Sequence, residues 1–294
     1  MSESGDILNL QGVIKKLCNH QLRNPMTYEQ TLLWIKQFED GSEKKLALLI
    51  LRFLIYRSSD QLKSSLKLAL KFTTVHFIPD ECVKEETDWR NVLIGEVGGL
   101  TFKCGPIKSD KPGKSGEVIS NLLKKCNLLT RYQHAYADKI TELADKDRFL
   151  LVDDGTYTGS QIKEYIQNNA KFMIGSNKAA IVVGFAHEEA LKNLAPLFEG
   201  LPKVPIFYGE KITQKECFEA LSKNWVEDGL WENNDITPIE QYYKIIKEKA
   251  KFKKCLPLGY GGLGCMVAYG HGIPNSSLQL LWGESSTWKP LIQR

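Results

Sequence analysis

Apolar side chains recur at helical spacing over the first 70 residues of the chain. Two stripes repeat every three to four residues, one over residues 28–38 and the other over residues 46–54. Ser58 and Gln61 then fit a capping box, which opens a third helix with apolar positions at Leu62, Leu66 and Leu70. The pattern predicts a small all-helical N-terminal unit over residues 1–71.

From residue 72 onward, short β-branched runs alternate with helical stripes. The runs predict strands at 73–78, 92–94, 100–102, 148–152, 180–185, 204–208 and 265–269. The stripes predict helices at 117–125, 160–169, 187–197, 214–222 and 238–250, the last with Pro238 in its first turn. This alternation implies right-handed crossovers. We therefore expect an α/β domain over residues 72–294, with a mainly parallel sheet flanked by helices.

The most informative run is Phe149 to Gln161, with the sequence FLLVDDGTYTGSQ. Four apolar residues predict a buried parallel strand, which ends at Asp153 and Asp154. A loop of small and hydroxyl-bearing residues then leads into a helix near Ser160. Ligands of open α/β sheets bind at the carboxyl ends of strands, and helix N-termini bind phosphate. Because carboxylates do not attract phosphate, the two aspartates suit sugar hydroxyls or a metal ion. A strand followed by a capped helix is the purely structural alternative.

This run resembles the signature with which type I phosphoribosyltransferases bind 5-phosphoribosyl 1-pyrophosphate (PRPP). The resemblance implies that Asp153 and Asp154 hold the ribose 2- and 3-hydroxyls. It implies a wrapping of the 5-phosphate by the following loop, which consists of Gly155, Thr156, Tyr157, Thr158, Gly159 and Ser160. Tyr157 and Gln161 stand where the family commonly has threonines, which sets this chain apart from ordinary salvage enzymes.

A second loop carries basic residues before the helix predicted at 117–125. Lys108, Lys111 and Lys114 precede Ser115 and Gly116. In type I phosphoribosyltransferases an earlier loop binds the pyrophosphate, and the resemblance assigns Lys114, Ser115 and Gly116 to it. Lysine and loop amides would stabilise the departing negative charge. A flexible basic surface loop is the alternative. An ATPase P-loop is not favoured, because Lys108 stands where its first glycine belongs.

The C-terminal segment narrows the resemblance. Six glycines between residues 259 and 272 surround the strand predicted at 265–269, and His271 and the run Pro274–Trp282 follow. The segment is similar to phosphoribosyltransferase-like proteins of bacterial conflict systems, among them toxic effectors encoded beside anti-phage retrons. His271 and Asn275 are then candidates for the rim of the ligand pocket, the alternative being a packed terminal loop. We expect Trp282 to be buried.

Two classes of function follow. The first is an enzyme that binds PRPP or a nucleotide with Mg²⁺ and acts at the ribose C1, by transfer or by cleavage, in anti-phage defence. Asp153, Asp154 and Lys114 are its candidate catalytic residues, and Mg²⁺ would bind through ligand oxygens, with Asp153 or Asp154 as further ligands. The second is a non-catalytic sensor of PRPP or a nucleotide that contacts a partner protein or nucleic acid.

Composition indicates the class of protein and the cellular compartment that either function would have. The chain has 294 residues, of which 43% are hydrophobic and 25% charged, so it can bury a core. No apolar window reaches the length of a membrane helix, and the acidic start does not fit a signal peptide. Seven scattered cysteines without a CxxC pair exclude a zinc ribbon and indicate a reduced cytoplasmic protein. A net charge of +4 is too mild to indicate nucleic-acid binding by itself. The resemblance adds two expectations, a homo-oligomer and a restraining or activating partner such as a retron component.

Overall fold

The computed structural model describes residues 3–39, 41–78, 88–96, 98–107, 115–125, 128, 130, 133–198, 204–233 and 235–292. These residues form two compact units. The sheet unit is continuous and comprises Gln61–Ile212. The discontinuous unit combines Met1–Asp60 with Thr213–Arg294. The two units thus divide the chain differently from the expected boundary at residue 71.

The sheet unit is built on four parallel strands in the order β2-β3-β4-β5. The strands are β2 (Thr101–Pro106), β3 (Asp147–Thr156), β4 (Ala179–His187) and β5 (Ile206–Ile212). Every residue of β4 is buried, as the run of small and branched apolar side chains predicts for a central parallel strand. The α/β class with a parallel sheet flanked by helices is confirmed.

The connections of the sheet unit reverse direction between β2 and β3. After β2 the chain passes through α6 (Ser115–Lys125) and returns at His134, which forms a parallel bridge with Cys104 of β2. The Ala135 amide donates to the Cys104 carbonyl at 3.0 Å, on the side of β2 away from β3. From β3, by contrast, the chain proceeds to β4 and then to β5. The carboxyl ends of β2 and β3 therefore form a topological switch point, where open α/β sheets bind their ligands.

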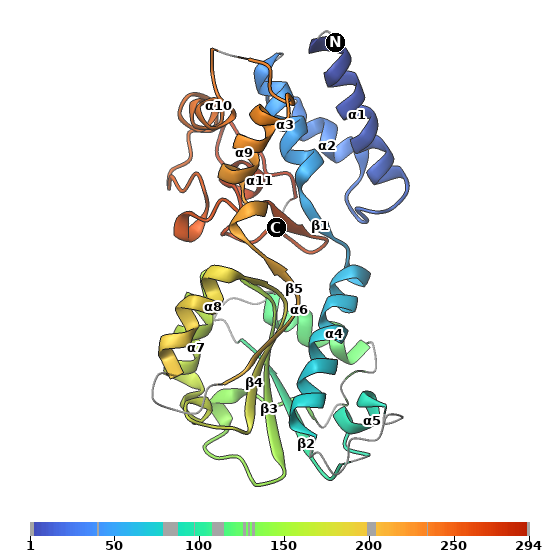
Figure 1. The fold of residues 1–294 in the computed structure, drawn as a ribbon, viewed down its shortest axis with the longest axis vertical. Helices are drawn as coiled ribbons and strands as arrows, with labels where there is room; N and C mark the ends of the chain where they lie inside the picture. Colours follow the sequence, from blue (N-terminus) through green and yellow to red (C-terminus); the bar gives the residue numbers. More distant parts are fainter. Residues whose placement is uncertain are drawn as a thin grey trace. The chain divides into compact units, whose positions relative to one another are not determined.

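Helices cover both faces of this sheet. Figure 1 shows α7 (Ser160–Asn169) and α8 (Glu188–Leu194) on one face and α4 (Ser59–Phe77) on the other. The first face packs Leu151, Ile181 and Val183 against Ile162 and Ile166. On the second face the absence of a side chain at Gly184 lets α4 approach, because a Cβ there would lie 2.5 Å from Leu62 Cδ1. Shorter helical segments complete the unit: α5 (Trp89–Leu93), η3 (Ala137–Lys139), η4 (Lys171–Met173) and η5 (Ala195–Phe198).

Two predicted strands are wrong. Residues 73–77 belong to α4, because the buried positions Leu66, Leu70, Thr73 and Phe77 continue its helical period. The hydroxyls of Thr73 and Thr74 donate to the carbonyls of Ala69 and Lys71, so the helix satisfies them. Residues 92–93 belong to the short helix α5, which Asp88 caps by accepting from the Arg90 amide at 3.0 Å. In both places periodicity and capping override β-propensity.

The other predicted elements of the sheet unit are confirmed with shifted ends. Helix α7 has the predicted bounds, and α6 begins two residues earlier than predicted. Strands β3 and β4 each extend beyond the predicted runs. Most of the basic loop lies outside the described residues, among them Lys108, Lys111 and Lys114.

The discontinuous unit joins segments from both ends of the chain. From the N-terminal side come α1 (Glu3–Asn19), α2 (Tyr28–Ile35), α3 (Ser42–Phe53) and β1 (Ile55–Arg57). From the C-terminal side come η6 (Gln214–Glu216), α9 (Phe218–Glu227), α10 (Pro238–Ile245), η7 (Ile246–Ala250), η8 (Tyr260–Gly262), β6 (Val267–Tyr269) and α11 (Gln279–Trp282). Strands β1 and β6 pair in parallel and tie the two sides together. The apolar stripes at 28–38 and 46–54 lie in helical segments, as predicted. The sequence predicts an all-helical start of the chain but no separate helix at the position of α1.

Aromatic side chains fill the core of this unit. The indole nitrogens of Trp34 and Trp288 both donate to the Leu280 carbonyl, at 3.0 and 2.9 Å. Phe38 packs edge-on against both rings, with centroid distances of 4.8 and 5.1 Å. Residues about 250 positions apart in sequence therefore share one core. Pro238 opens α10 as predicted, beside a Thr237–Glu240 capping box.

Two expectations from composition bear on the described residues. Among these residues, no helix has the length and apolar character needed to cross a membrane. Of the cysteines that the structure describes, Cys18, Cys104, Cys217 and Cys265 are buried thiols and Cys255 is an exposed one.

Candidate functional site at the switch point

The two aspartates predicted to hold a sugar lie at the carboxyl end of β3. Asp153 is 2% exposed and Asp154 is 9% exposed. Asp153 stands opposite Val183 of the central strand β4, and its Oδ1 accepts from the Asp154 amide at 2.9 Å. Burying two neighbouring carboxylates costs free energy unless their oxygens have partners. Both residues interact with other groups of the chain, and their place at the carboxyl end of a parallel strand is the feature that a ligand could use.

The loop that follows turns sharply into α7. Strand pairing continues through Gly155 and Thr156, which stand opposite Phe185 and Ala186. Gly159 then adopts a left-handed conformation, with φ of 77°, as the N-cap of α7. The hydroxyls of Thr158 and Ser160 lie 2.8 Å apart, and the Ser160 amide donates to Thr158 Oγ1 at 3.4 Å. The loop thus gathers hydroxyl groups at a helix N-terminus, where backbone amides lack intrahelical partners.

Helix α8 supports this loop from behind. A Cβ at Gly159 would lie 3.0 Å from Leu194 Cγ and 3.1 Å from the Ala190 carbonyl, so only glycine fits without a shift. The Asn193 amide side chain donates to the Thr158 carbonyl at 3.1 Å. Sequence reasoning missed Asn193, because its role arises from the packing of α8 and no pattern near Asn193 marks it.

The helices at this edge differ in the charge of their first turns. Helix α7 has no acidic residue there, whereas α8 begins with Glu188 and Glu189 and α6 carries Glu117. The positive end of a helix dipole favours an anion, and acidic side chains in the first turn already supply that charge. The N-terminus of α7 is therefore the best placed of the three to receive a phosphate.

The second predicted loop begins at the neighbouring strand. Pro106 at the end of β2 stands opposite Val152 of β3, one residue before Asp153. The ends of the loop meet, because a Cβ at Gly116 would lie 2.7 Å from the Ile107 carbonyl. Ser115 is the first residue of α6, but its side chain and all of Lys114 lie outside the described residues. The two sequence-predicted loops thus leave the sheet side by side.

This arrangement of a parallel sheet, a switch point and two adjacent loops agrees with the result of a family comparison. A family model described as PRTase-CE matches residues 32–294. The chain belongs to the PRTase-CE family. No curated protein matches the sequence. The match makes the protein phosphoribosyltransferase-like, and it begins within α2. Both compact units, and not the sheet unit alone, therefore belong to the PRTase-CE region.

The predicted pocket-rim residues lie in the discontinuous unit of this PRTase-CE chain. The His271 ring stacks on Tyr269, with centroids 5.2 Å apart and an interplanar angle of 1°. The Asn275 carbonyl accepts from the Tyr260 amide at 2.7 Å. Trp282 is half-buried, and its indole nitrogen donates to the Ser277 carbonyl at 2.8 Å. These contacts hold the terminal loop together, and a rim role of His271 and Asn275 stays a prediction.

Two other titratable groups of the sheet unit have pKa values that burial shifts. Burial raises the pKa of Cys104 and lowers that of His134, so Cys104 is not an activated thiolate. His187, at the end of β4, caps α8 by accepting from the Glu189 amide at its Nδ1, at 3.1 Å.

The donor set at the switch point suits a magnesium ion. Mg²⁺ prefers oxygen ligands, and it is usually held by one or two carboxylates together with substrate phosphates. Asp153 and Asp154 supply carboxylates at a strand end, beside a loop of hydroxyl groups. The residues therefore fit such an ion, and Asp153 or Asp154 would be its protein ligand.

Proposed function

We propose that the sheet unit binds PRPP or a related nucleotide at the carboxyl ends of β2 and β3 and acts at the ribose C1. The observation that carries the proposal is the position of Asp153, Asp154 and the α7 N-terminus at the topological switch point. A ligand with both sugar hydroxyls and a phosphate matches carboxylates placed next to a phosphate cradle.

Each group has a distinct role in the proposed reaction. Asp153 and Asp154 accept hydrogen bonds from the ribose 2- and 3-hydroxyls and fix the sugar. Loop residues 155–160 hold the 5-phosphate through amides and the hydroxyls of Thr158 and Ser160. Lys114, Ser115 and Gly116 receive the leaving group, and Mg²⁺ neutralises part of the phosphate charge when bound.

The chemistry at C1 then requires positioning more than proton transfer. The bond from C1 to pyrophosphate, or to a base, breaks with its electron pair leaving on that group. A nucleophile from the acceptor, or water, forms the new bond at C1. Fixed sugar hydroxyls and a charge-stabilising loop lower the barrier to such a step.

The biological role that we propose is defence against phage. Cleavage or modification of nucleotides by such a site would limit phage replication, and a toxic activity of this kind needs a restraining or activating partner, either a protein or a nucleic acid such as a retron component. We also propose a cytoplasmic homo-oligomer. The chain acts in this view as an effector.

A non-catalytic sensor is the second candidate. Tyr157 stands where related enzymes commonly have a threonine, and its side chain is only 7% exposed. This departure from the pattern of the related enzymes, together with Gln161, is what favours a site that binds without turnover. Consumption of PRPP or a nucleotide by the purified protein, followed by ³¹P NMR, would exclude the sensor.

Calorimetric titration of PRPP with Mg²⁺ tests the binding proposal. We expect the wild type to bind and Asp153→Asn/Asp154→Asn to lose binding while remaining folded. Asp138→Asn/Asp145→Asn is the matched control, because it changes the charge equally at exposed positions of the same unit. Equal binding by the wild type and the Asp153/Asp154 variant would contradict the proposal.

A further inference from the structure

Helix α4 presents an apolar stripe on the side that does not pack on the sheet. On its inner side Leu62 lies against Gly184 of β4. On its outer side Leu68, Phe72 and Val75 are 42%, 49% and 52% exposed. These three residues follow one another at i, i+4 and i+7, the spacing of one helix face. The stripe therefore extends along about two turns of the helix.

The stripe holds most of the exposed large apolar side chains in the described part of the sheet unit. Among these residues Tyr136 is the only exposed one that lies outside α4. Single exposed apolar side chains are normal on a soluble protein. Three on one helix face form a patch, and such patches mark surfaces that bind partners.

Three lysines line one flank of the stripe. Lys63, Lys67 and Lys71 recur at every fourth position, and the last two immediately precede Leu68 and Phe72. None of the three lysines forms an ion pair with the residues that the structure describes. The only acidic residue of α4 lies in its first turn. The flank is thus a row of positive charges that the helix itself does not neutralise.

The opposite flank of the stripe is turned toward β5, the last strand of the sheet. Ser65 Oγ donates to Glu210 at 2.6 Å, and the His76 ring lies 5.4 Å from the ring of Phe207. The exposed surface is therefore asymmetric, with cations on one side of the apolar stripe and the sheet edge on the other. We call the apolar stripe and its lysine row the outer face of α4.

This charge distribution matches an amphipathic helix with an acidic flank. When helices pair, an apolar seam is flanked by charged positions that select the partner. Grooves and faces that bind helices use apolar anchors at the spacing seen here. An antiparallel pairing of α4 with a second copy would bring the two lysine rows together, and like charges repel. The single basic flank thus favours a partner that is not this chain.

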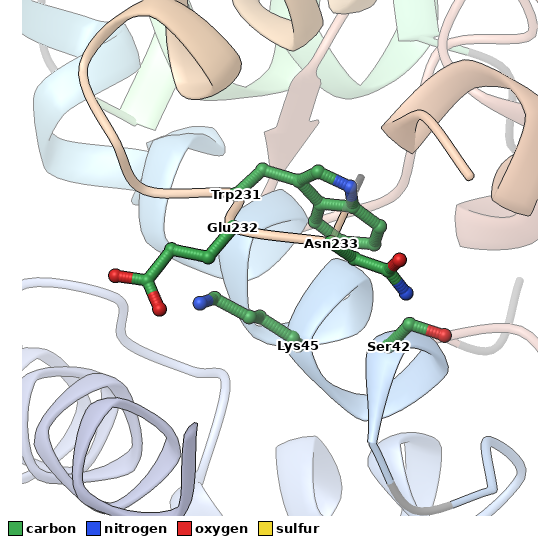
Figure 2. A pocket seen from close by; sticks show the side chains of 5 residues that line it. All are labelled: Ser42, Lys45, Trp231, Glu232 and Asn233. Atoms are coloured by element: carbon green, nitrogen blue, oxygen red, sulfur yellow. The ribbon is translucent and has the colours of Figure 1, made fainter. Parts of the chain in front are cut away.

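Lys45 of the discontinuous unit shows the contrasting arrangement. Figure 2 shows its ammonium on the same side as the Glu232 carboxylate, in a pocket of about 230 Å³. The ammonium lies 3.6 Å from Asp6 Oδ2, and the lysine side chain is 6% exposed. A buried, paired lysine leaves no charge for a partner, unlike the lysines of α4.

We propose that the outer face of α4 binds an acidic amphipathic helix of a partner protein. The three exposed apolar side chains receive the apolar stripe of that helix, and the three lysines pair with its carboxylates. Because the contact spans only two to three turns, the complex belongs to the class of weak, reversible interactions. The proposal does not depend on the reaction at the switch point, because α4 contributes no residue to that site.

Two synthetic helices test the outer face on the full chain by fluorescence anisotropy. Both have about 20 residues and a stripe of leucines. One carries glutamate at the flanking positions, and the other carries lysine there. We expect the glutamate helix to bind at least about tenfold more tightly than the lysine helix.

Two variants separate the apolar contact from the charge. Phe72→Ser removes the central apolar contact and should weaken binding of the glutamate helix about tenfold. Lys67→Glu/Lys71→Glu reverses the flank and should make the lysine helix the tighter ligand. Lys139→Glu/Lys171→Glu is the matched control, because it makes the same charge change at exposed positions of the same unit. It should bind as the wild type does, and melting temperatures verify that all variants are folded.

The proposal would be overturned by equal affinity for the two helices, or by glutamate-helix binding that Phe72→Ser and the flank reversal leave unchanged. An equal loss in the control variant would also contradict it, because binding would then follow net charge alone. Binding to phosphatidylserine vesicles, or self-association, that Phe72→Ser abolishes while the glutamate helix does not bind would assign the face to a membrane or to a second copy instead.

Discussion

The two compact units differ in how their sequence specifies them. The sheet unit is one continuous segment in which each strand pairs with a strand that is near in sequence. The discontinuous unit joins β1 to β6 and Trp34 to Leu280, pairs more than 200 residues apart. Local patterns therefore describe the first unit well, whereas the second is defined by contacts that no local pattern contains.

The two units also differ in which kinds of side chain they gather. The sheet unit places charged and hydroxyl groups at one edge, around Asp153, Asp154 and the α7 N-terminus. The discontinuous unit instead buries aromatic side chains around the Leu280 carbonyl, which accepts from the indoles of Trp34 and Trp288. Changes at this edge of the sheet unit should thus alter ligand binding, and changes in the aromatic core of the discontinuous unit should alter stability.

The largest effect is expected from Trp34→Ala. The substitution removes a buried ring and a hydrogen bond to Leu280, and large-to-small changes of this kind cost about 3–5 kcal/mol. Hydrogen exchange should show faster exchange in α3, with β3 and β4 less affected. Leu33→Ala, one residue away but exposed, should change stability by less than about 0.5 kcal/mol. Equal acceleration in both units after Trp34→Ala would mean that they unfold together, which would remove the distinction.

A smaller loss is expected from Gly209→Ala in the sheet unit. A Cβ at Gly209 would lie 2.5 Å from the carbonyl carbon of Ser65, so α4 would have to move away from β5. Overpacking of this type costs about 1–3 kcal/mol. Gly12→Ala is the matched control, because nothing lies within 4 Å of that position inside α1. The control should gain about 0.5–1 kcal/mol in urea denaturation. An unchanged free energy of unfolding in Gly209→Ala would contradict the close contact between α4 and β5.

Lys249→Met tests an ion-pair cluster in the discontinuous unit. Lys249 lies 2.8 Å from Glu39 and 2.6 Å from the buried Glu43, and its loss should cost about 1–2 kcal/mol at neutral pH. Its hydrogen bond holds the pKa of Glu39 below the usual value. Because that folded-state pKa is lowered, the stabilisation is present above the unfolded pKa and is lost as pH falls through the folded pKa. Thermal melts between pH 6 and 3 should therefore show a smaller acid loss in Lys249→Met. A steeper loss would contradict this account.

The smallest effect on stability and a selective effect on binding are expected from Asn193→Ala. The exposed Asn193 side chain holds the Thr158 carbonyl, so its removal should loosen the phosphate loop but leave the fold intact. Loss of one hydrogen bond predicts a several-fold weaker affinity for PRPP. Lys192→Ala, a neighbouring exposed position on α8, is the control. If wild type binds and both variants bind equally, Asn193 does not position the loop.

The sequence predicts the sheet unit better than the discontinuous unit, because the patterns that define the sheet unit are local. The apolar run 149–152 fixed the place of β3, and the hydroxyl loop marked the start of α7. The sequence prediction ends helix α4 too early, because Thr73, Thr74 and Val75 have high β-propensity. In the structure the buried helical period continues through Phe77. The family comparison confirms the phosphoribosyltransferase-like character that the motif at 149–161 indicated.

Other features depended on tertiary packing and could not be read from the chain. The contact of Asn193 with Thr158 requires α8 to lie behind the loop. Residues 1–60 and 213–294 form one compact unit, because β6 pairs with β1 and Trp288 packs on Trp34 of α2. Lys114 of the predicted pyrophosphate loop lies outside the described residues, so its role stays a prediction.

Hydrogen exchange on the full chain, with and without PRPP and Mg²⁺, tests the central claim most directly. The account predicts that bound ligand slows exchange at the amides of residues 155–160 and at the start of α6. Peptides from the opposite end of the sheet, around Asp147, should not change. Ligand binding that leaves residues 155–160 unprotected, or no protection anywhere at saturating PRPP, would contradict a phosphoribosyl site at the switch point.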